Sequence, residues 1–252
     1  MNTFIYKASL IMGLLLLGVG SSVAQSTYGN SALEEGYRQI EIGKALNAMA
    51  STGKRPEDFV PPHWKVYARA DGDLNRDGIN ETAMVLQLDL EDKAYVNQLQ
   101  GAKKIESWGP NTYMIMIVRP LPNKTLEFDG VNYSIGAIPQ GDRDEFTIDI
   151  KNGVLNVHTS TGGSLRNDET YRFREDPPTG GFLTLIGYDA KSYSVTPQPD
   201  SGEYSLSENY LTGERLEKTT TFDKKGNASE KQSKSTFKPE KTEFSETSPR
   251  CH

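Results

Sequence analysis

Apolar residues near the start of the chain follow a helical period. Between residues 31 and 50 they recur every three or four positions, as on the buried stripe of an α-helix. These residues are Leu33, Tyr37, Ile40, Ala45 and Met49. Ser31 and Glu34 have the spacing of a capping box, in which two side chains accept hydrogen bonds from the first free amides. The pattern predicts a helix at about residues 31–50 that packs on a sheet.

From Trp64 onward the period of the apolar residues changes to two, which is typical of strands with one buried face. The alternating residues are Val66, Ala68 and Ala70, and then Met84, Leu86, Leu88 and Leu90. Residues 112–118 are apolar on both faces, as in a central strand that is covered on both sides.

The second half of the chain predicts consecutive hairpins. Alternating strands at 146–150 and 154–158 flank Asn152-Gly153, a strong signal for a tight β-turn. Further strand patterns follow at 171–173, 182–188, 204–210 and 215–222. We therefore expect an α+β fold that is mainly antiparallel β, a meander of hairpins with the N-terminal helix packed on the sheet.

Both ends of the chain differ in composition from the middle. Lys7, an uncharged run at 8–20 and Ser22-Val23-Ala24 predict a signal peptide at residues 1–24. The alternative is an uncleaved membrane anchor. Cleavage near Ala24 would place the protein in the periplasm or outside the cell, with no stable membrane insertion afterwards.

We expect residues 25–222 to form a single β-rich domain. Residues 223–252 are polar, and a turn at 224–227 would form a polar hairpin that protects a sheet edge. Disorder is the alternative, and it is the prediction for the tail from about residue 238.

Charge and cysteine content exclude some classes of protein. The net charge is −6, and removing Lys7 with the signal peptide makes it −7, which disfavours binding to nucleic acid. Cys251 is the one cysteine in the chain, so no intrachain disulfide can form. The fold must be held by its core, by a metal or by both; Cys251 is either a free thiol or a link between chains.

Residues 73–81 have the spacing of a calcium-binding loop. Asp73, Asn75 and Asp77 occupy alternate positions, Ile79 offers its backbone carbonyl, and Glu81 stands at the ninth position. Gly78 allows the sharp turn at the sixth position, and Ca²⁺ prefers such a set of oxygen ligands. A turn without metal is the alternative, because Asn, Asp and Gly also favour turns.

The loop is not an EF-hand, because Met84 occupies the twelfth position, where that motif needs an acid. Residues 70–78, followed by Glu81 and the apolar residues 83–86, resemble the calcium loop of FG-GAP repeats, found in integrin α-subunit propellers and in many secreted bacterial proteins. The resemblance implies four side-chain ligands and one carbonyl ligand, with Glu in place of the usual last Asp. These ligands are Asp73, Asn75, Asp77, Ile79 through its carbonyl, and Glu81. A single loop does not make a full propeller.

Segments 183–189 and 207–213 are also similar to a block in an uncharacterised secreted bacterial family that carries one such loop. The three histidines, His63, His158 and His252, lie in no catalytic motif. We expect an exported, non-enzymatic module held by one calcium ion that binds an unknown protein or glycan partner. The alternatives are a secreted hydrolase without a local motif and a protective partner of a secreted toxin.

Overall fold

The computed structural model describes residues 39–89, 91, 95, 112–135, 145–175, 182–195, 202–223 and 225–247. The predicted signal peptide and the first part of the predicted helix lie outside these residues. An α-helix spans residues 39–48, and Tyr95 is also helical; short 3₁₀ helices are η1 (Pro56–Phe59) and η2 (Phe244–Glu246).

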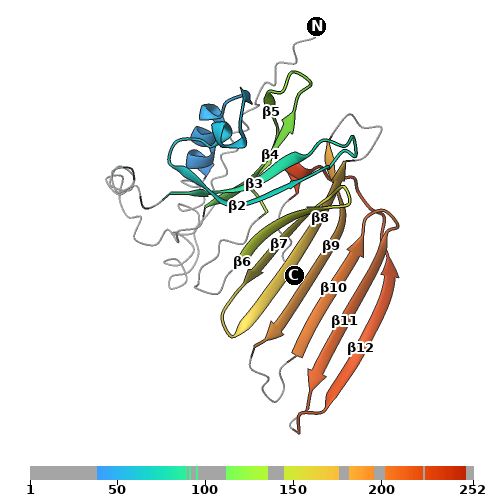
Figure 1. Cartoon of the computed structure of the whole chain (residues 1–252). Helices are drawn as coiled ribbons and strands as arrows, with labels where there is room; N and C mark the ends of the chain where they lie inside the picture. Colours follow the sequence, from blue (N-terminus) through green and yellow to red (C-terminus); the bar gives the residue numbers. More distant parts are fainter. Residues whose placement is uncertain are drawn as a thin grey trace, which may run out of the picture. The chain divides into compact units, whose positions relative to one another are not determined.

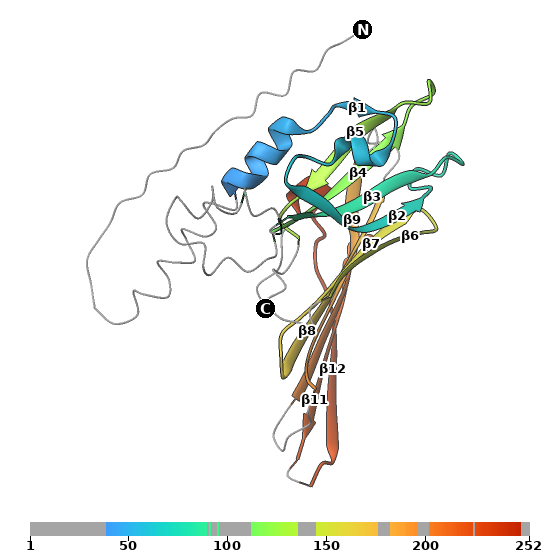
Figure 2. The same ribbon diagram turned by 60° about the vertical axis from the view of Figure 1, so that its left-hand side comes forward.

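The described strands form two antiparallel sheets (Figures 1 and 2). In spatial order, the five-stranded sheet contains β1 (Thr52–Gly53), β5 (Leu126–Asn132), β4 (Tyr113–Pro120), β3 (Glu81–Leu88) and β2 (Trp64–Gly72). The seven-stranded sheet contains β12 (Ala228–Thr236), β11 (Glu214–Phe222), β10 (Gly202–Asn209), β9 (Leu183–Ser194), β8 (Leu165–Glu175), β7 (Val154–Thr161) and β6 (Glu145–Lys151). The prediction of a mainly antiparallel β fold built from hairpins is confirmed.

The strand predictions match the structure at β4 and at the β6–β7 hairpin. The predicted buried face of Val66, Ala68 and Ala70 is wrong at Val66, which is 40% exposed, because the register of β2 against β3 shifts between Val66 and Ala68. β4 lies between β3 and β5 and is buried on both faces, as the apolar run predicts. Asn152 and Gly153 join β6 to β7, and both have positive φ angles, 54° and 72°. This is the left-handed geometry that a two-residue hairpin turn requires.

Residues from both sheets share one apolar core. Val85 and Ile115 of the five-stranded sheet belong to the same buried cluster as Val157, Tyr171 and Phe173 of the seven-stranded sheet. β6 also lies next to β2 in both views. The other face of β3 and β4 carries a second buried cluster that includes Met84 and Met116.

The C-terminal region returns to this core. β12 pairs with β11 at the edge of its sheet, where the sequence predicts a polar hairpin. The sequence also predicts disorder from about residue 238, and residues 238–247 of this tail are among those that the structure describes. The side chain of Phe244 is only 5% exposed and packs edge-on against Phe173, and Asn132 Nδ2 donates to the carbonyl oxygens of Phe244 and Thr247.

Candidate functional site

The acidic loop connects β2 to β3, and the pairing of Gly72 with Glu81 closes it. Asp73 accepts two backbone hydrogen bonds, from Asp77 N to Oδ1 (3.0 Å) and from Gly78 N to Oδ2 (2.9 Å). Gly78 has a φ of 86°, so the sharp turn falls where the sequence places it. The loop is thus curled around its own carboxylates.

Two more polar side chains take part in this curl. Asn75 Oδ1 accepts from Asp77 N at 2.9 Å, and Asn75 Nδ2 donates to Asp77 Oδ2 at 2.9 Å. Asp77 Oδ1 accepts from Ile79 N at 2.7 Å. Each of these oxygens has a second lone pair, so a hydrogen bond from an amide does not prevent it from binding a cation.

Glu81 differs from the other acids because it is buried, with 1% of its surface exposed. Its Oε2 accepts a hydrogen bond from Leu74 N at 2.7 Å, but its Oε1 accepts none. Burial raises the pKa of this carboxyl, against the lowering effects of the Leu74 amide, the Arg119 charge and the Asn75 amide. A buried carboxylate oxygen without a donor is costly, so its presence at the base of the loop needs a partner.

All five predicted ligand residues lie within residues 73–81. The carboxylates of Asp73, Asp77 and Glu81 do not converge on a common point. Within the described ranges, no three His, Cys, Asp or Glu side chains lie close enough to hold a metal ion. The side chain of Ile79 is exposed, as is expected of a residue that contributes only its carbonyl. The two remaining candidate ligands are uncharged: the Asn75 amide oxygen and the Ile79 carbonyl oxygen.

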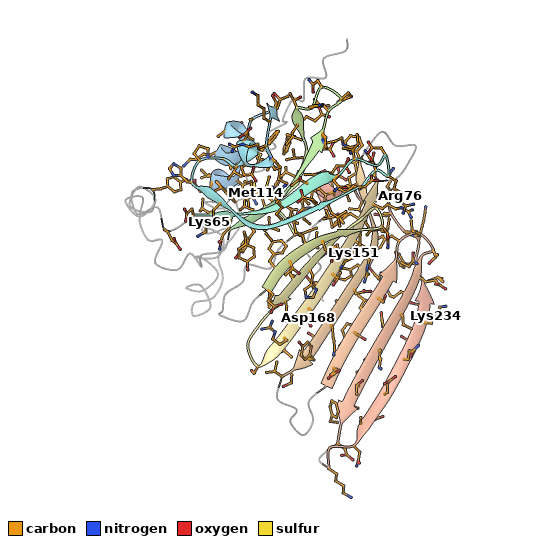
Figure 3. The ribbon with its side chains drawn as sticks, in the orientation of Figure 1. Lys65, Arg76, Met114, Lys151, Asp168 and Lys234 are labelled. Carbon is orange, nitrogen blue, oxygen red and sulfur yellow. The ribbon has the colours of Figure 1, made fainter. Side chains whose placement is uncertain are left out.

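The loop also contacts the seven-stranded sheet. Arg76 Nη2 donates to the carbonyl oxygen of Asn152 at 2.9 Å, and the Arg76 side chain covers Gly153. Arg76 is labelled in Figure 3. A cavity of about 370 Å³ lies beside this contact and is lined by Asp73, Arg76, Ile150, Asn152 and Gly153. The acidic loop therefore contacts the β6–β7 turn through the Arg76 side chain.

A charged cluster that the sequence analysis does not predict lies close to this loop. Arg119, at the end of β4, donates from Nη2 to Asp129 (3.0 Å) and to Glu175 (3.1 Å). Burial lowers the pKa of Arg119, but the two carboxylates outweigh this effect and raise it. Arg119 also lowers the pKa of Glu81 through its charge. A lone Arg after the apolar run 113–118 is the signal that could have revealed it.

A second polar network lies on the core face of the seven-stranded sheet. Glu169 accepts hydrogen bonds from the hydroxyls of Tyr188 (2.7 Å) and Tyr171 (3.1 Å). The buried carboxylate of Glu208 pairs with Arg215 and accepts from the Tyr210 hydroxyl at 2.9 Å. Both acids are thus engaged by neighbouring side chains, as expected of groups that stabilise the sheet.

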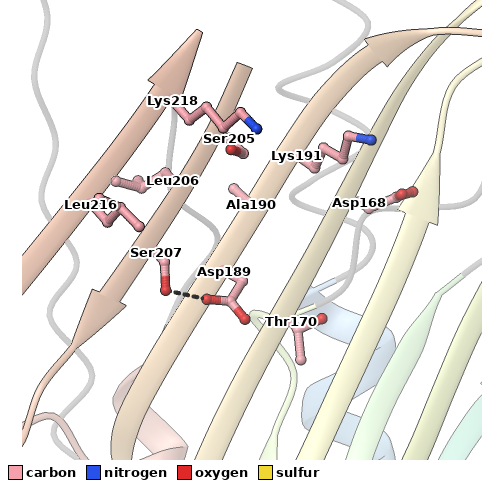
Figure 4. Close-up of a pocket in the computed structure, with 10 residues that line it drawn as sticks. All are labelled: Asp168, Thr170, Asp189, Ala190, Lys191, Ser205, Leu206, Ser207, Leu216 and Lys218. Carbon is pink, nitrogen blue, oxygen red and sulfur yellow. Dashed lines mark hydrogen bonds between the residues drawn. The ribbon is translucent and has the colours of Figure 1, made fainter. Parts of the chain in front are cut away.

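The opposite face of this sheet carries a shallow groove of about 280 Å³ (Figure 4). The charged and hydroxyl groups that line it come from β8 to β11: Asp168, Thr170, Asp189, Lys191, Ser205, Ser207 and Lys218. Asp189 pairs with Arg172, Lys191 with Glu203, and Lys218 with Glu230. These ion pairs neutralise the groove within the sheet itself.

Two of the three histidines lie in the described part of the chain. His63 stacks on the ring of Tyr95, with centroids 3.9 Å apart. His158 Nδ1 lies 3.0 Å from Thr170 Oγ1. His252 lies outside the described residues.

No protein-family model matches this chain, and searches of curated proteins and of solved structures return no match. No helix in the described part of the chain is long and apolar enough to cross a bilayer.

Proposed function

We propose that this chain is an exported, non-enzymatic β-rich module in which one calcium ion, bound at residues 73–81, stabilises the contact between the two sheets. The observation that carries the proposal is the buried Oε1 of Glu81, which has no hydrogen-bond donor. A cation at the loop would supply the missing partner, and it would also relieve the repulsion among the loop's three acids.

The donor set fits a hard cation, because every candidate ligand atom is an oxygen. Asp73, Asn75, Asp77 and Glu81 would contribute side-chain oxygens, and Ile79 its carbonyl. Binding requires the acids to turn toward a common point. The hydrogen bond from Asn75 Nδ2 to Asp77 Oδ2 is the contact that this movement would break.

The contacts of the loop explain why a cation there would act on the whole domain. Arg76 binds the carbonyl of Asn152, and Gly72, at the start of the loop, packs against Ile150. A cation that orders residues 73–81 would therefore also order the β6–β7 turn. Stability, and not chemistry, is the effect we assign to the metal.

The same proposal includes a signal peptide at residues 1–24 and a periplasmic or extracellular location. It also includes packing of the helix at 39–48 on the face of β3 and β4 that carries the second cluster. Ile42 and Ala45 are buried members of that cluster, together with Met84 and Met116, and this supports the packing. The partner would be a protein or a glycan.

The test is thermal unfolding of the purified chain in Ca²⁺, in Mg²⁺ and in chelator. We expect Ca²⁺ to raise the melting temperature, because a ligand at 100 times its Kd adds about 2.7 kcal/mol to the free energy of unfolding. Asp77→Asn should abolish the response. A matched substitution of an exposed acid outside the loop, Glu240→Gln, should keep it.

Glu81→Gln gives a sharper result, because it should change stability in opposite directions under the two conditions. In chelator it removes a buried charge whose Oε1 has no hydrogen-bond donor, so the variant should equal or exceed the wild type. In Ca²⁺ it removes a ligand, so the variant should fall below the wild type. Equal responses of wild type, Asp77→Asn and Glu81→Gln to Ca²⁺ would overturn the proposal.

A further inference from the structure

β12 is the last strand of the seven-stranded sheet, and among the described residues its outer edge carries no paired strand. β12 pairs with β11 in continuous register, from Ala228 opposite Phe222 to Thr236 opposite Glu214. It is the terminal strand in the order of that sheet, so within the described part of the chain no strand pairs with its other side (Figure 1). All nine residues of β12 are exposed.

Free edges expose backbone donors and acceptors that can pair with another chain, and proteins usually block them with proline, bulges or repelling charges. β12 contains no proline, and its pairing with β11 has no irregularity. Its charges are Glu230, Lys231 and Lys234. The question is therefore whether these charges repel or attract a second β12.

Pairing of two identical antiparallel strands about a two-fold axis perpendicular to the sheet places one residue opposite itself. An axis at Gln232 lets all nine residues pair, and it sets Glu230 of each copy opposite Lys234 of the other. Lys231 then faces Ser233. The strand is thus complementary to itself in the one register that uses its full length.

Other registers are less favourable. An axis at Glu230, Lys231 or Lys234 places two identical charges opposite each other, which is destabilising. An axis at Ser233 leaves residues unpaired and forms no opposite-charge pair. Charge and length therefore select the same register.

Ion pairs within each chain already orient these charges. Lys218 Nζ lies 2.7 Å from Glu230 Oε2, and Lys234 Nζ lies 2.8 Å from Glu214 Oε1. Glu230 and Lys234 are four residues apart in a strand and so share one face of the sheet; Figure 3 marks Lys234 on β12. Across the junction the charges would alternate in sign, from Lys218 and Glu230 of one copy to Lys234 and Glu214 of the other.

We infer that β12 is a homodimerisation edge: two copies pair through antiparallel β12 strands centred on Gln232, and they join their seven-stranded sheets into one. This inference is independent of the calcium proposal, because β12 and the acidic loop share no residue. The contact is polar and exposed, so the dimer dissociates in a concentration-dependent and salt-dependent way.

The experiment is sedimentation velocity of the full chain over a range of concentrations, with charge-exchange variants. We expect a monomer–dimer equilibrium for the wild type. Glu230→Lys and Lys234→Glu, each alone, replace both opposite-charge pairs by like-charge pairs and should weaken association by at least about tenfold. An equimolar mixture of the two variants should form a heterodimer, because the exchanged charges complement each other again.

Lys231→Glu is the matched control, since it changes the net charge as Lys234→Glu does but at a position that faces Ser233. It should leave association near the wild-type level. Circular dichroism of each variant verifies folding. A wild type that stays monomeric at all concentrations, equal effects of Lys231→Glu and Lys234→Glu, or a mixture that fails to associate would each overturn the inference.

Discussion

Arg76 of the acidic loop donates a hydrogen bond from Nη2 to the backbone carbonyl oxygen of Asn152, 2.9 Å away. These residues are 76 positions apart in the sequence and lie in connections that belong to different sheets. The contact joins the loop after β2 to the turn between β6 and β7, so a change in one of them should be felt in the other.

Gly153→Ala tests the contact below Arg76. Gly153 has a φ of 72°, and a Cβ there would lie 2.6 Å from Arg76 Nε. We expect a loss of about 2 kcal/mol in the free energy of unfolding, measured by urea denaturation. Gly226→Ala is the matched control, because Gly226 has a φ of 80° but open space around it. It should lose only the backbone part, about 1 kcal/mol, and an equal loss at both sites would contradict the contact.

Gly72→Ala tests the packing of β2 on β6. A Cβ at Gly72 would lie 2.5 Å from Ile150 Cγ2, and such overpacking costs about 1–3 kcal/mol. In an Ile150→Ala background the same substitution should cost less, because the methyl group at 2.5 Å is gone, but part of the cost should remain because the β-carbon of residue 150 at 2.8 Å is kept. Denaturation of the two single variants and the double variant measures this coupling. Gly163→Ala, which meets no atom within 4 Å, should be nearly neutral, and strictly additive losses at 72 and 150 would refute the packing.

Arg119→Ala should destabilise the protein by about 2–4 kcal/mol, because it leaves the carboxylates of Asp129 and Glu175 half-buried without a cation. Chemical denaturation measures the loss. Lys65→Ala, which removes an exposed ion pair with Asp89, should cost less than about 1 kcal/mol. Similar losses for the two variants would mean that the Arg119 cluster contributes no more than a surface pair.

Tyr188→Phe should change the response to alkaline pH. Burial, together with the Glu169 carboxylate, raises the pKa of the Tyr188 hydroxyl above its ordinary value. The unfolded chain therefore loses this proton first, and the free energy of unfolding falls as the pH rises above about 10. The variant should be about 1 kcal/mol less stable at neutral pH but should lose less between about pH 9 and 11. Tyr67→Phe, at a side chain that is 42% exposed, is the control; identical slopes for all three proteins would contradict the prediction.

Phe244→Ala tests the placement of the C-terminal region. Removal of a buried phenyl ring costs about 3–5 kcal/mol, and Phe244 packs on Phe173 in the core shared by the two sheets. Phe182→Ala, at a side chain that is 44% exposed, should cost much less in the same thermal unfolding experiment. If residues 238–247 were disordered, as the sequence predicts, Phe244→Ala would have almost no effect.

The predictable parts of this fold are those that depend on neighbours in sequence. The apolar run that becomes β4 and the Asn152-Gly153 turn are local signals, and both predict what the structure contains. Phe244 is one apolar residue in a polar stretch and sets up no period, so its burial depends on a distant partner in β8. Arg119 pairs with Glu175, which is 56 residues further along the chain. No local pattern can indicate such a pairing.

The acidic loop shows the same division. Spacing places five possible ligands in one loop, and the structure keeps them there. The burial of Glu81, which is 1% exposed, is not revealed by spacing alone. Calcium binding itself stays a prediction.

The complete exposure of β12 has a consequence for how this protein can vary. No side chain of that strand fills the core, so substitutions along it act on the surface and change the stability of the fold little. Selection for a different neighbour can therefore change the order of charges on β12 without loss of the fold. Related chains can then differ in what their edge strand recognises while they keep the same interior.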